Sequence, residues 1–443
     1  MIRSIYHKGF FHLLSVNFLT QFLGFGTTLL VAKFLSPVEL GEIKILQSYA
    51  GLFVVLGGFG INTAVLKICS EKHNERYKGH ILRYALVRSM LYATIALGVM
   101  VLLNLTGVIT SSPHLSLWLV VYSLIVPFAV VSEILTVFIQ ALKKIKEMAG
   151  AQAVIKGQSF VLIVICTCLW GFRGFILATI IAYVVGVLPL LRQVGLKYLS
   201  PVAGDVTGIP KLFSHIALFS MLANGVSLIG RYADIFILDH FVSNRAEIGY
   251  YSLATIFVLG AMQITHTVQS IATPYFSEHA DEEIWFRRQL LRNQARMAAL
   301  SVMVAILLYG AAFFFVPFFY GPVYQSTLVY LAILLIRYIV WSSYAILGVA
   351  VVGLGLVRLN FVASIICTSI NLCLTYLLLQ RFGVVGVAWA QTVSAVIYFF
   401  ICIVVMRMAL RQAFGSGHKD SAQARARQTA SLRPYGKSKE REE

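Results

Sequence analysis

Charged residues are scarce in this sequence. Of its 443 residues only 12% are charged and 59% are hydrophobic, and the mean hydropathy is +0.82. A soluble domain carries about 25% charged residues, so this chain has too few polar side chains to cover a water-soluble globule. The composition excludes a soluble protein and predicts that a lipid bilayer surrounds the chain.

Acidic residues are scarcer than basic ones. The chain has 18 Asp and Glu against 36 Lys and Arg, which gives a net charge of +18. The basic residues lie in short loops between apolar runs and in the C-terminal tail, as the positive-inside rule predicts for a membrane protein. We therefore expect membrane lipids around the chain and no nucleic-acid partner.

Motifs for catalysis and for metal or cofactor binding are missing. The sequence has no Gly-rich phosphate loop followed by Lys-Ser/Thr, no nucleophile elbow and no Asp-rich metal site. The six cysteines lack metal-ligand spacing, and we interpret them as packing residues (Cys69, Cys166, Cys168, Cys367, Cys373 and Cys402). We expect a protein that is not an enzyme and that needs no cofactor or metal.

Long apolar runs are abundant. About twelve segments reach the roughly 20 residues that a helix needs to cross a bilayer, where helices satisfy their own backbone hydrogen bonds. The first run follows Arg3 and Lys8 and is too long for a signal peptide, so it is expected to remain as a membrane helix. The sequence predicts an all-α polytopic membrane protein with spans at residues 10–34, 45–68, 85–107, 115–141, 150–170, 174–191, 212–238, 249–275, 297–319, 325–350, 359–380 and 385–407.

The charges of the short loops predict the orientation. Loops on the side of the N-terminus hold most of the Lys and Arg, whereas the loops on the opposite side hold only Arg173, Arg245 and Arg381. Lys and Arg accumulate in cytoplasmic loops. Both termini are therefore predicted to lie in the cytoplasm.

Two local matches indicate an internal repeat. Residues 34–41 (FLSPVELG) are echoed by residues 241–249 (FVSNRAEIG), and residues 171–174 (GFRG) by residues 383–386 (GVVG). Six spans in each half make the repeat parallel, and such halves enclose a central cavity. We predict an N-terminal six-helix bundle at 1–192, a cytoplasmic connector at 193–211, a C-terminal six-helix bundle at 212–411 and a disordered basic tail at 412–443.

Charged side chains inside the spans are candidate functional residues, because charge in hydrocarbon is costly. Arg231 falls in the outer half of the seventh span, and Asp234 follows three positions later, close enough to pair with it. The pair is either a packing element that neutralises itself or a substrate-facing cation held by its carboxylate. Arg337, near the middle of the tenth span, has no acidic residue within one turn, so it needs a partner from another helix, a substrate or water.

Three further charges lie in the first half of the chain. Lys156 is about two turns into the fifth span and Lys33 is near the end of the first, where both can snorkel to the interface; Lys33 is also placed to line the outer mouth of a cavity. Glu133 is the carboxylate well inside this half. It is a candidate ion-coupling residue together with Asp234, or a hydrogen-bond partner of a nearby glutamine (Gln140 or Gln152).

Cations outnumber carboxylates among these residues. A cavity lined in this way attracts phosphate groups or acidic sugars, with which arginine forms bidentate contacts. The candidates for substrate binding are Arg231, Arg337, Lys156 and Lys33, and the candidates for ion coupling are Asp234 and Glu133.

Four short motifs occur in order along the chain. They are LSPVELG at 35–41, GGFGINTAVLK at 57–67, YGPVY at 320–324 and RFGVVG at 381–386. They resemble the loop after the first helix, the close of the second helix, the FGP-x-Y loop and the YG-x-x-G turn of the polysaccharide-transporter, or oligosaccharide (O-antigen) flippase, family of the multidrug-extrusion-like superfamily. The resemblance runs from about residue 10 to residue 407.

The resemblance implies export of an undecaprenyl-pyrophosphate-linked oligosaccharide, such as the O-antigen unit of lipopolysaccharide, from the inner to the outer leaflet of a bacterial cytoplasmic (inner) membrane. It implies two six-helix bundles in a V around a cationic cavity and alternating access coupled to a proton or sodium gradient. Polysaccharide polymerase or assembly proteins would be partners. The family has no sharp catalytic motif, so Arg231 and Arg337 are nominated from depth and charge alone.

Other functions fit less well. An ion-coupled multidrug or small-metabolite antiporter on the same scaffold would favour an acidic cavity, whereas this chain has more buried cations. A polytopic glycan polymerase or lipid-linked glycosyltransferase would need a large outer loop with catalytic residues, and the outer loops here are short. A membrane scaffold that transports nothing would not need buried charges.

Overall fold

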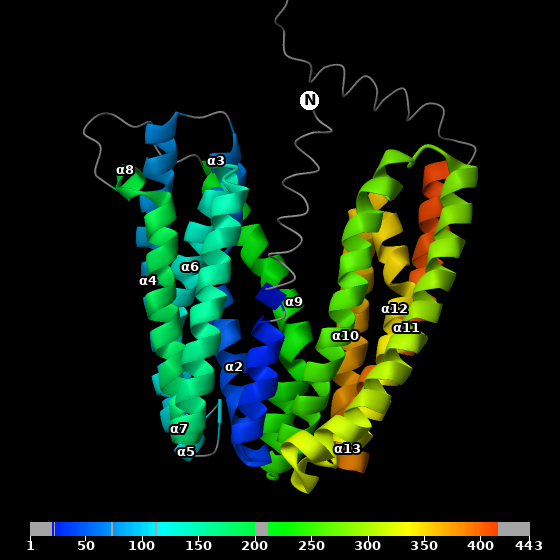
Figure 1. Ribbon diagram of the computed structural model, residues 1–443. Coiled ribbons are helices and arrows are strands. Elements are labelled where there is room, and N and C mark those ends of the chain that lie inside the picture. Colours follow the sequence, from blue (N-terminus) through cyan, green and yellow to red (C-terminus); the bar gives the residue numbers. More distant parts are fainter. Residues whose placement is uncertain are drawn as a thin grey trace, which may run out of the picture. The chain divides into compact units, whose positions relative to one another are not determined.

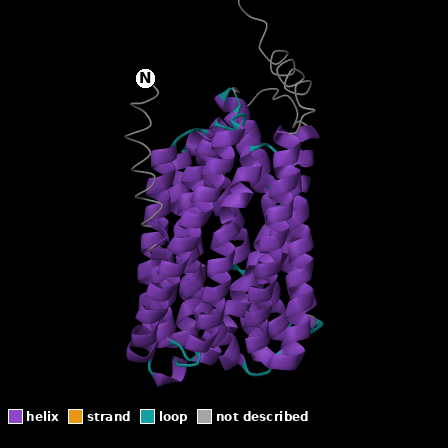
Figure 2. Ribbon diagram, turned by 90° about the vertical axis from the view of Figure 1, so that its right-hand side faces the viewer, coloured by secondary structure: helices purple, strands orange, loops and turns teal. Residues whose placement is uncertain are grey.

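The computed structural model describes residues 20–21, 23–71, 74–107, 109–110, 113–199 and 211–414 (Figure 1). Within them the regular elements are helices and no strand occurs (Figure 2). The first part of the first predicted span, residues 200–210 of the predicted connector and the predicted tail from residue 415 onward lie outside the described residues.

The helices follow the apolar runs of the sequence. The chain leaves a first helix at Phe34, whose described apolar part is Leu23–Phe34. The elements after it are α2 (Pro37–Gly58), α3 (Ile61–Ser70), α4 (Glu75–Leu105), α5 (Pro113–Ser123), α6 (Ile125–Ala141), α7 (Ile145–Val194), α8 (Leu196–Leu199), α9 (Lys211–Phe241), α10 (Arg245–Glu278), α11 (Glu283–Tyr320), a 3₁₀ turn (Pro322–Tyr324), α12 (Thr327–Gly353) and α13 (Val357–Phe414).

Helix α7 is a helical hairpin. Its 50 residues would extend about 75 Å as one straight helix, more than twice the roughly 30 Å of a bilayer core. The chain turns back at Gly171, where φ is 56° and ψ is −136°, a conformation that glycine adopts readily. A Cβ atom on Gly174 would lie 2.0 Å from the carbonyl oxygen of Cys166, so the two arms of α7 pack closely against each other.

Helix α13 repeats this hairpin. Gly383 has φ 60° and ψ −148°, and a Cβ atom on Gly386 would lie 2.1 Å from the carbonyl oxygen of Leu378. Gly383, Gly386 and Leu378 each follow their counterparts in α7 by 212 positions. The structure therefore confirms the repeat that the GFRG and GVVG matches predict.

These hairpins explain how the helices correspond to twelve spans. Eight stretches of the described residues are long and apolar enough to cross a membrane; one is formed by α5 and α6 together, and two, α7 and α13, contain two spans each. The helix ending at Phe34 and α9, whose described apolar parts are the shorter stretches Leu23–Phe34 and Leu212–Leu222, correspond to the remaining two predicted spans. The predicted all-α polytopic fold is confirmed. The second predicted span, 45–68, differs from the structure: its helix begins earlier, at Pro37, and is interrupted at Phe59 and Gly60, where α2 ends and α3 begins.

The N-terminal ends of α2 and α10 are the second repeated feature. Ser36 and Glu39 form a capping box, in which the Ser36 backbone N–H donates to Glu39 Oε2 over 2.8 Å and the Glu39 N–H donates to Ser36 Oγ over 3.3 Å. This arrangement satisfies N–H groups that have no partner within the helix. At α10, Asn244 Oδ1 accepts from the backbone N–H of Ala246 over 3.2 Å.

These two helix ends also contact each other reciprocally. A Cβ atom on Gly41 would lie 2.4 Å from the carbonyl oxygen of Arg245, and one on Gly249 would lie 1.8 Å from the carbonyl oxygen of Pro37. Gly249 and Arg245 follow Gly41 and Pro37 by the same 208 positions. Equivalent residues of the two repeats thus contact each other across a local twofold relation.

The described chain forms two compact units. Unit 1 contains the described residues up to Gly260 together with Leu308–Leu335 and Asn371–Gln391. In it α2 packs against α4, α6 and α9, and α6 packs against α7. Helix α8 anchors the start of the predicted connector to α4, where Lys197 Nζ lies 3.0 Å from Glu75 Oε2; this hydrogen bond raises the pKa of Lys197.

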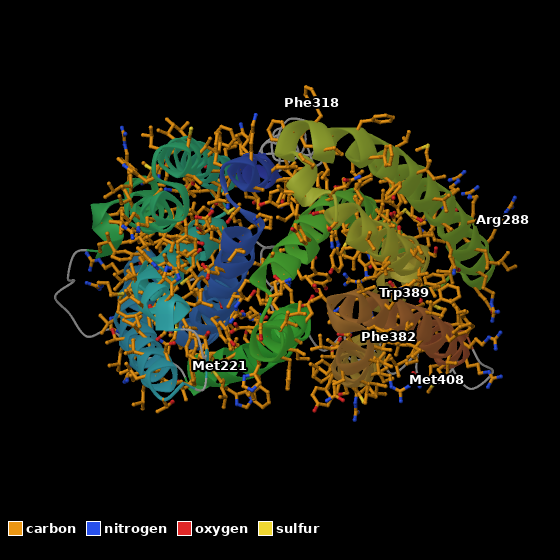
Figure 3. All side chains as sticks on the ribbon, turned by 90° about the horizontal axis from the view of Figure 1, so that it is seen from below. Met221, Arg288, Phe318, Phe382, Trp389 and Met408 are labelled. Atoms are coloured by element: carbon orange, nitrogen blue, oxygen red, sulfur yellow. The ribbon has the colours of Figure 1, made fainter. Side chains whose placement is uncertain are left out.

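Unit 2 contains Ala261–Leu307, Ile336–Ile370 and the described residues from Thr392 onward. Its core is built from α10, α11, α12 and α13, with large side chains such as Phe276, Phe286 and Tyr344 buried together. Seen from below in Figure 3, Arg288 of α11 projects away from the ribbon.

Candidate functional site: charged side chains of the spans

Asp234 lies in a buried position of α9 and points toward α10. Its residue is 9% exposed. Tyr251 of α10 donates its hydroxyl proton to Asp234 Oδ2 over 2.5 Å, and Oδ1 accepts from the backbone N–H of Ile235 over 2.9 Å. Lys44 of α2 lies within electrostatic range of the same carboxylate. Asp234 thus joins three helices of unit 1.

Arg231 does not take part in this arrangement. It is exposed on α9, and within the described residues no ion pair joins it to Asp234. The pairing expected from the spacing of three residues is therefore wrong. The spacing brings two side chains near one another, but the Asp234 carboxylate accepts its hydrogen bond from the Tyr251 hydroxyl instead. The guanidinium of Arg231 stays accessible.

A second carboxylate of α9 has the stronger partner. Arg245 Nη1 lies 2.5 Å from Asp239 Oδ1, with side chains that are 14% and 1% exposed. The single hydroxyl proton of Tyr49 on α2 lies between two acceptors, Asp239 Oδ2 at 3.1 Å and the carbonyl oxygen of Ile109 at 2.9 Å from the hydroxyl oxygen. This network ties α2 to the end of α9 and the start of α10, beside the reciprocal glycine contact.

Sequence reasoning missed this network for an identifiable reason. Asp239 and Arg245 lie at the ends of two consecutive helices, so Arg245 looked like a loop residue. Lys44 was missed because the second span was predicted to begin at residue 45, whereas α2 begins at Pro37. A useful signal was available, because Glu42, Lys44 and Tyr49 are polar residues in the otherwise apolar start of α2.

The other first-half candidates lie at accessible positions. Glu133 on α6 and Lys156 on α7 are both exposed. The glutamine expected as one partner of Glu133 is engaged elsewhere, since Gln152 donates to Thr136 Oγ1 over 3.0 Å. Tyr183 of α7 lies within electrostatic range of Glu133. Tyr183 is thus a neighbour of Glu133 that the sequence did not indicate.

Lys33 and Arg337 have different surroundings. The Nζ atom of Lys33 lies 4.3 Å from the centre of the Phe319 ring, a cation–π contact that holds it at the end of α11. Arg337 on α12 belongs to unit 2 and is half-buried. Its neighbour Tyr338 is fully buried near Thr265 and Ser342. Within the described residues Arg337 forms no ion pair.

A metal centre is not formed by the described part of the chain. There, no group of three or more His, Cys, Asp and Glu side chains comes together in a way that suits a metal ion. The chemistry that these side chains offer is the binding of anions by arginine and lysine and the binding or release of a cation by carboxylates.

The fold is that of a known class of membrane transporters. A multidrug resistance MATE family transporter of the MOP superfamily, in an inward-facing conformation, superposes with a TM-score of 0.74 at 12% identity, over 92% of this chain and 99% of that one. The lipid II flippase MurJ, in an inward closed conformation, gives a TM-score of 0.70 at 16% identity, over 90% and 89%. The Vibrio cholerae MATE transporter VcmN gives 0.59 at 16% identity, over 93% and 98%. This chain is a multi-pass membrane protein with the MATE and MurJ fold.

The sequence then places the chain in a family. The family model described as "Polysaccharide biosynthesis protein" matches residues 6–280, more than half of the chain, so the protein belongs to the polysaccharide biosynthesis protein family. No curated protein sequence shows significant similarity to the chain. The family agrees with the one that the four sequence motifs resemble.

Proposed function

We propose that this protein flips a lipid-linked oligosaccharide, of the undecaprenyl-pyrophosphate-linked O-antigen or related repeat-unit class, from the inner to the outer leaflet of a bacterial cytoplasmic membrane. Membership of the polysaccharide biosynthesis family carries the proposal. The similarity of fold to a lipid II flippase supports it, because lipid II flipping is movement of a lipid-linked glycan. Polysaccharide polymerase or assembly proteins are the expected partners, and no chemical step is assigned to the chain.

The accessible cations support an anionic substrate. Arg231 and Lys156 are exposed although they lie within apolar helices. A guanidinium or ammonium group that faces hydrocarbon is costly, so charges in spans face water or protein. We infer that these two side chains face water-filled space, where they bind the pyrophosphate or acidic sugars of the substrate. Arg337 and Lys33 remain further candidates for this role.

The proposed bundles are residues 1–192 and 212–411, joined by a cytoplasmic connector at 193–211, with both termini in the cytoplasm. Movement between conformations open to one side and to the other carries the headgroup, while the lipid tail stays in the bilayer. We infer that a proton or sodium gradient drives the cycle. Asp234 and Glu133 are the proposed coupling residues, and the hydrogen bond from Tyr251 keeps the Asp234 side chain in place.

A multidrug or small-metabolite antiporter is the second candidate. The superposition on a MATE transporter with a TM-score of 0.74 favours it, and the buried carboxylate Asp234, whose hydrogen-bond donor is uncharged, is typical of cation binding. A MATE-like fold alone does not select a substrate. The family match and the accessible cations favour the flippase.

Complementation tests the proposal. A bacterial strain that lacks this gene is given the wild-type chain or the variants Arg231→Ala, Arg337→Ala and Asp234→Asn, and surface glycan is quantified by lectin or antibody binding. We expect the wild type to restore display, Arg231→Ala to reduce it at least tenfold, and Asp234→Asn to abolish it. Arg381→Ala, an exposed cation outside the candidate set, is the control and should behave as wild type.

Two results would contradict parts of the proposal. Normal display with both arginine variants, expressed at wild-type level, would remove the assignment of anion binding to Arg231 and Arg337. A deletion strain with unchanged surface glycan but increased drug sensitivity would contradict the flippase function and support the antiporter function.

A further inference from the structure

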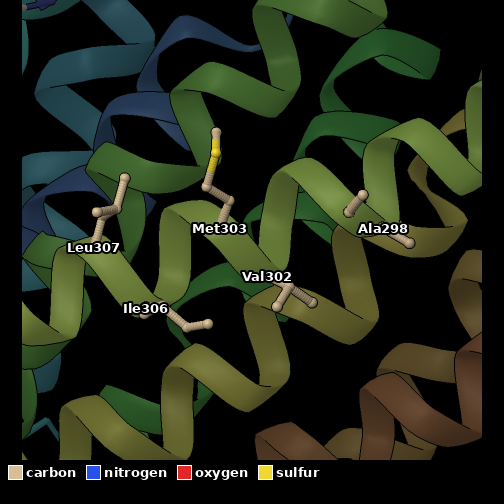
Figure 4. Close-up of a pocket in the computed structure, with 6 residues that line it drawn as sticks. Ala298, Val302, Met303, Ile306 and Leu307 are labelled. Atoms are coloured by element: carbon tan, nitrogen blue, oxygen red, sulfur yellow. The ribbon is translucent and has the colours of Figure 1, made fainter.

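Helix α11 carries an apolar concavity that none of the proposed transport steps uses. It has a volume of about 620 Å³ and is lined by side chains of α11 alone: Ala298, Ala299, Val302, Met303, Ile306 and Leu307 (Figure 4). The last two side chains are 66% and 64% exposed. The concavity is shallow and open, and it arises where the small side chains of two alanines lie beside larger ones on the same helix.

Arginines precede the concavity on the same face of the helix. Arg288 lies fourteen residues before Val302 and Arg292 eleven residues before Met303, which correspond to about four and about three turns of helix. Both arginines are exposed, and Arg288 points away from the ribbon in Figure 3. This face of α11 therefore has a cationic end and an apolar end.

The cationic end is open for a ligand. Arg288 forms no hydrogen bond or ion pair with any described residue. Arg292 contacts Gln289, a neutral side chain, through one nitrogen, which leaves its charge uncompensated. By contrast, Arg287 forms an ion pair with Glu283 over 2.8 Å. Of the four arginines at the start of α11, Arg287 is ion-paired, whereas Arg288, Arg292 and the exposed Arg296 have no acidic partner among the described residues.

We propose that the α11 face binds one anionic phospholipid, whose phosphate headgroup contacts Arg288 and Arg292 and whose acyl chain fills the concavity from Ala298 to Leu307. Arg292 precedes Ala298 by six residues, or about 9 Å along the helix, so headgroup and chain follow one another as they do in a lipid. Arginine binds phosphate oxygens through paired N–H donors. Basic sites beside membrane helices attract anionic headgroups.

This site is independent of the proposed transport function. It involves none of the candidate substrate or coupling residues, and its ligand is a lipid of the membrane rather than the transported one. A positively charged helix end that only orients the chain in the membrane would need no concavity beside it, so the binding of the acyl chain distinguishes the two explanations.

Lipid binding to the purified full-length protein tests the proposal. Native mass spectrometry would measure retention of phosphatidylglycerol and of zwitterionic phosphatidylethanolamine for the wild type, Arg288→Gln/Arg292→Gln and Ala299→Trp. We expect the wild type to retain phosphatidylglycerol in preference to phosphatidylethanolamine. Retention of phosphatidylglycerol should fall about fivefold for each arginine replaced and about thirtyfold when both are replaced. It should fall by a comparable amount when tryptophan fills the concavity. Arg287→Gln is the matched control and should bind as wild type.

Equal retention of the two lipids by the wild type, or unchanged phosphatidylglycerol binding by the double variant, would overturn the site. Loss with the arginine variants but not with Ala299→Trp would overturn the role of the concavity. Displacement of phosphatidylglycerol by an equimolar polyprenyl phosphate would show that the ligand of this site is a carrier lipid and not a phospholipid. Complementation should be unaffected by the Arg288→Gln/Arg292→Gln variant, so failure of either proposal is separable from the other.

Discussion

The two carboxylates of α9 have different partners, and this difference predicts different roles. Asp234 accepts a hydrogen bond from a neutral tyrosine hydroxyl, whereas Asp239 is ion-paired with Arg245 and nearly inaccessible. A carboxylate held by a fixed cation is a structural element, because releasing it would leave a buried charge without a partner. Asp234, whose donor is uncharged, is the better candidate for gaining and losing a cation during a cycle.

The Asp239→Asn variant tests the structural role. It leaves the largely buried Arg245 guanidinium without its ion-pair partner, and breaking a buried pair costs about 3–5 kcal/mol. We expect a clearly lower thermal midpoint for the purified protein in detergent, measured by tryptophan fluorescence or scanning calorimetry.

The exposed pair between Arg287 and Glu283 supplies the control. The Glu283→Gln variant should change stability by less than about 1 kcal/mol, as is typical of surface ion pairs. Similar thermal midpoints for Asp239→Asn and Glu283→Gln would show that the Asp239–Arg245 pair contributes no more to stability than the surface pair does.

At the scale of helices, close packing depends on glycines at specific positions. The α2–α10 contact has no room for a side chain at Gly41 or Gly249, because a Cβ atom there would overlap a backbone carbonyl oxygen. Backbone cannot move aside as a flexible side chain can, so substitution forces the two helices apart. The same applies to Gly174 and Gly386 within their hairpins.

We therefore predict that Gly249→Ala destabilises the protein by about 1–3 kcal/mol, as overpacking typically does, and that Gly41→Ala has an effect of similar size. Gly98 in α4 has no atom within 4 Å of its would-be Cβ, and Gly98→Ala should stabilise its helix by up to about 1 kcal/mol. Denaturation midpoints of the three variants test this prediction. Equal midpoints would mean that the α2–α10 contact is not close-packed in the protein.

Most helices were predictable, because the length of an apolar run and the residues at its ends determine where a span begins and ends. The start of α2 at Pro37 was not, because the polar residues Glu42 and Lys44 make its first turns look like a loop. The hairpin turns were visible as GFRG and GVVG. The partners of the charged residues were not predictable in the same way. The i, i+3 spacing places Arg231 near Asp234, but the hydrogen-bond donor that reaches Asp234 comes from Tyr251 on another helix, and a single sequence holds no direct record of which helices are neighbours.

The charge distribution makes a prediction for the whole molecule. Twelve spans are an even number, so both termini lie on one side, and the Lys and Arg content of the loops predicts that this side is cytoplasmic. Protease-cleavable tags added to either terminus should be cut in inverted membrane vesicles and protected in intact spheroplasts. A tag cut in spheroplasts at one end only would contradict the even number of spans.

The reciprocal contact of Gly41 with Arg245 and of Gly249 with Pro37 bears on the ancestry of the chain. When residue i of one copy touches residue j of another and j touches i, the interface is the kind that closes a symmetric dimer. A six-span ancestor half as long would have used the same face to pair with an identical copy of itself. Fusion of two such genes would have required only a linker, because parallel copies with an even number of spans end and begin on the same side of the membrane. Gly41 and Gly249 would then be the equivalent interface residues of the two copies.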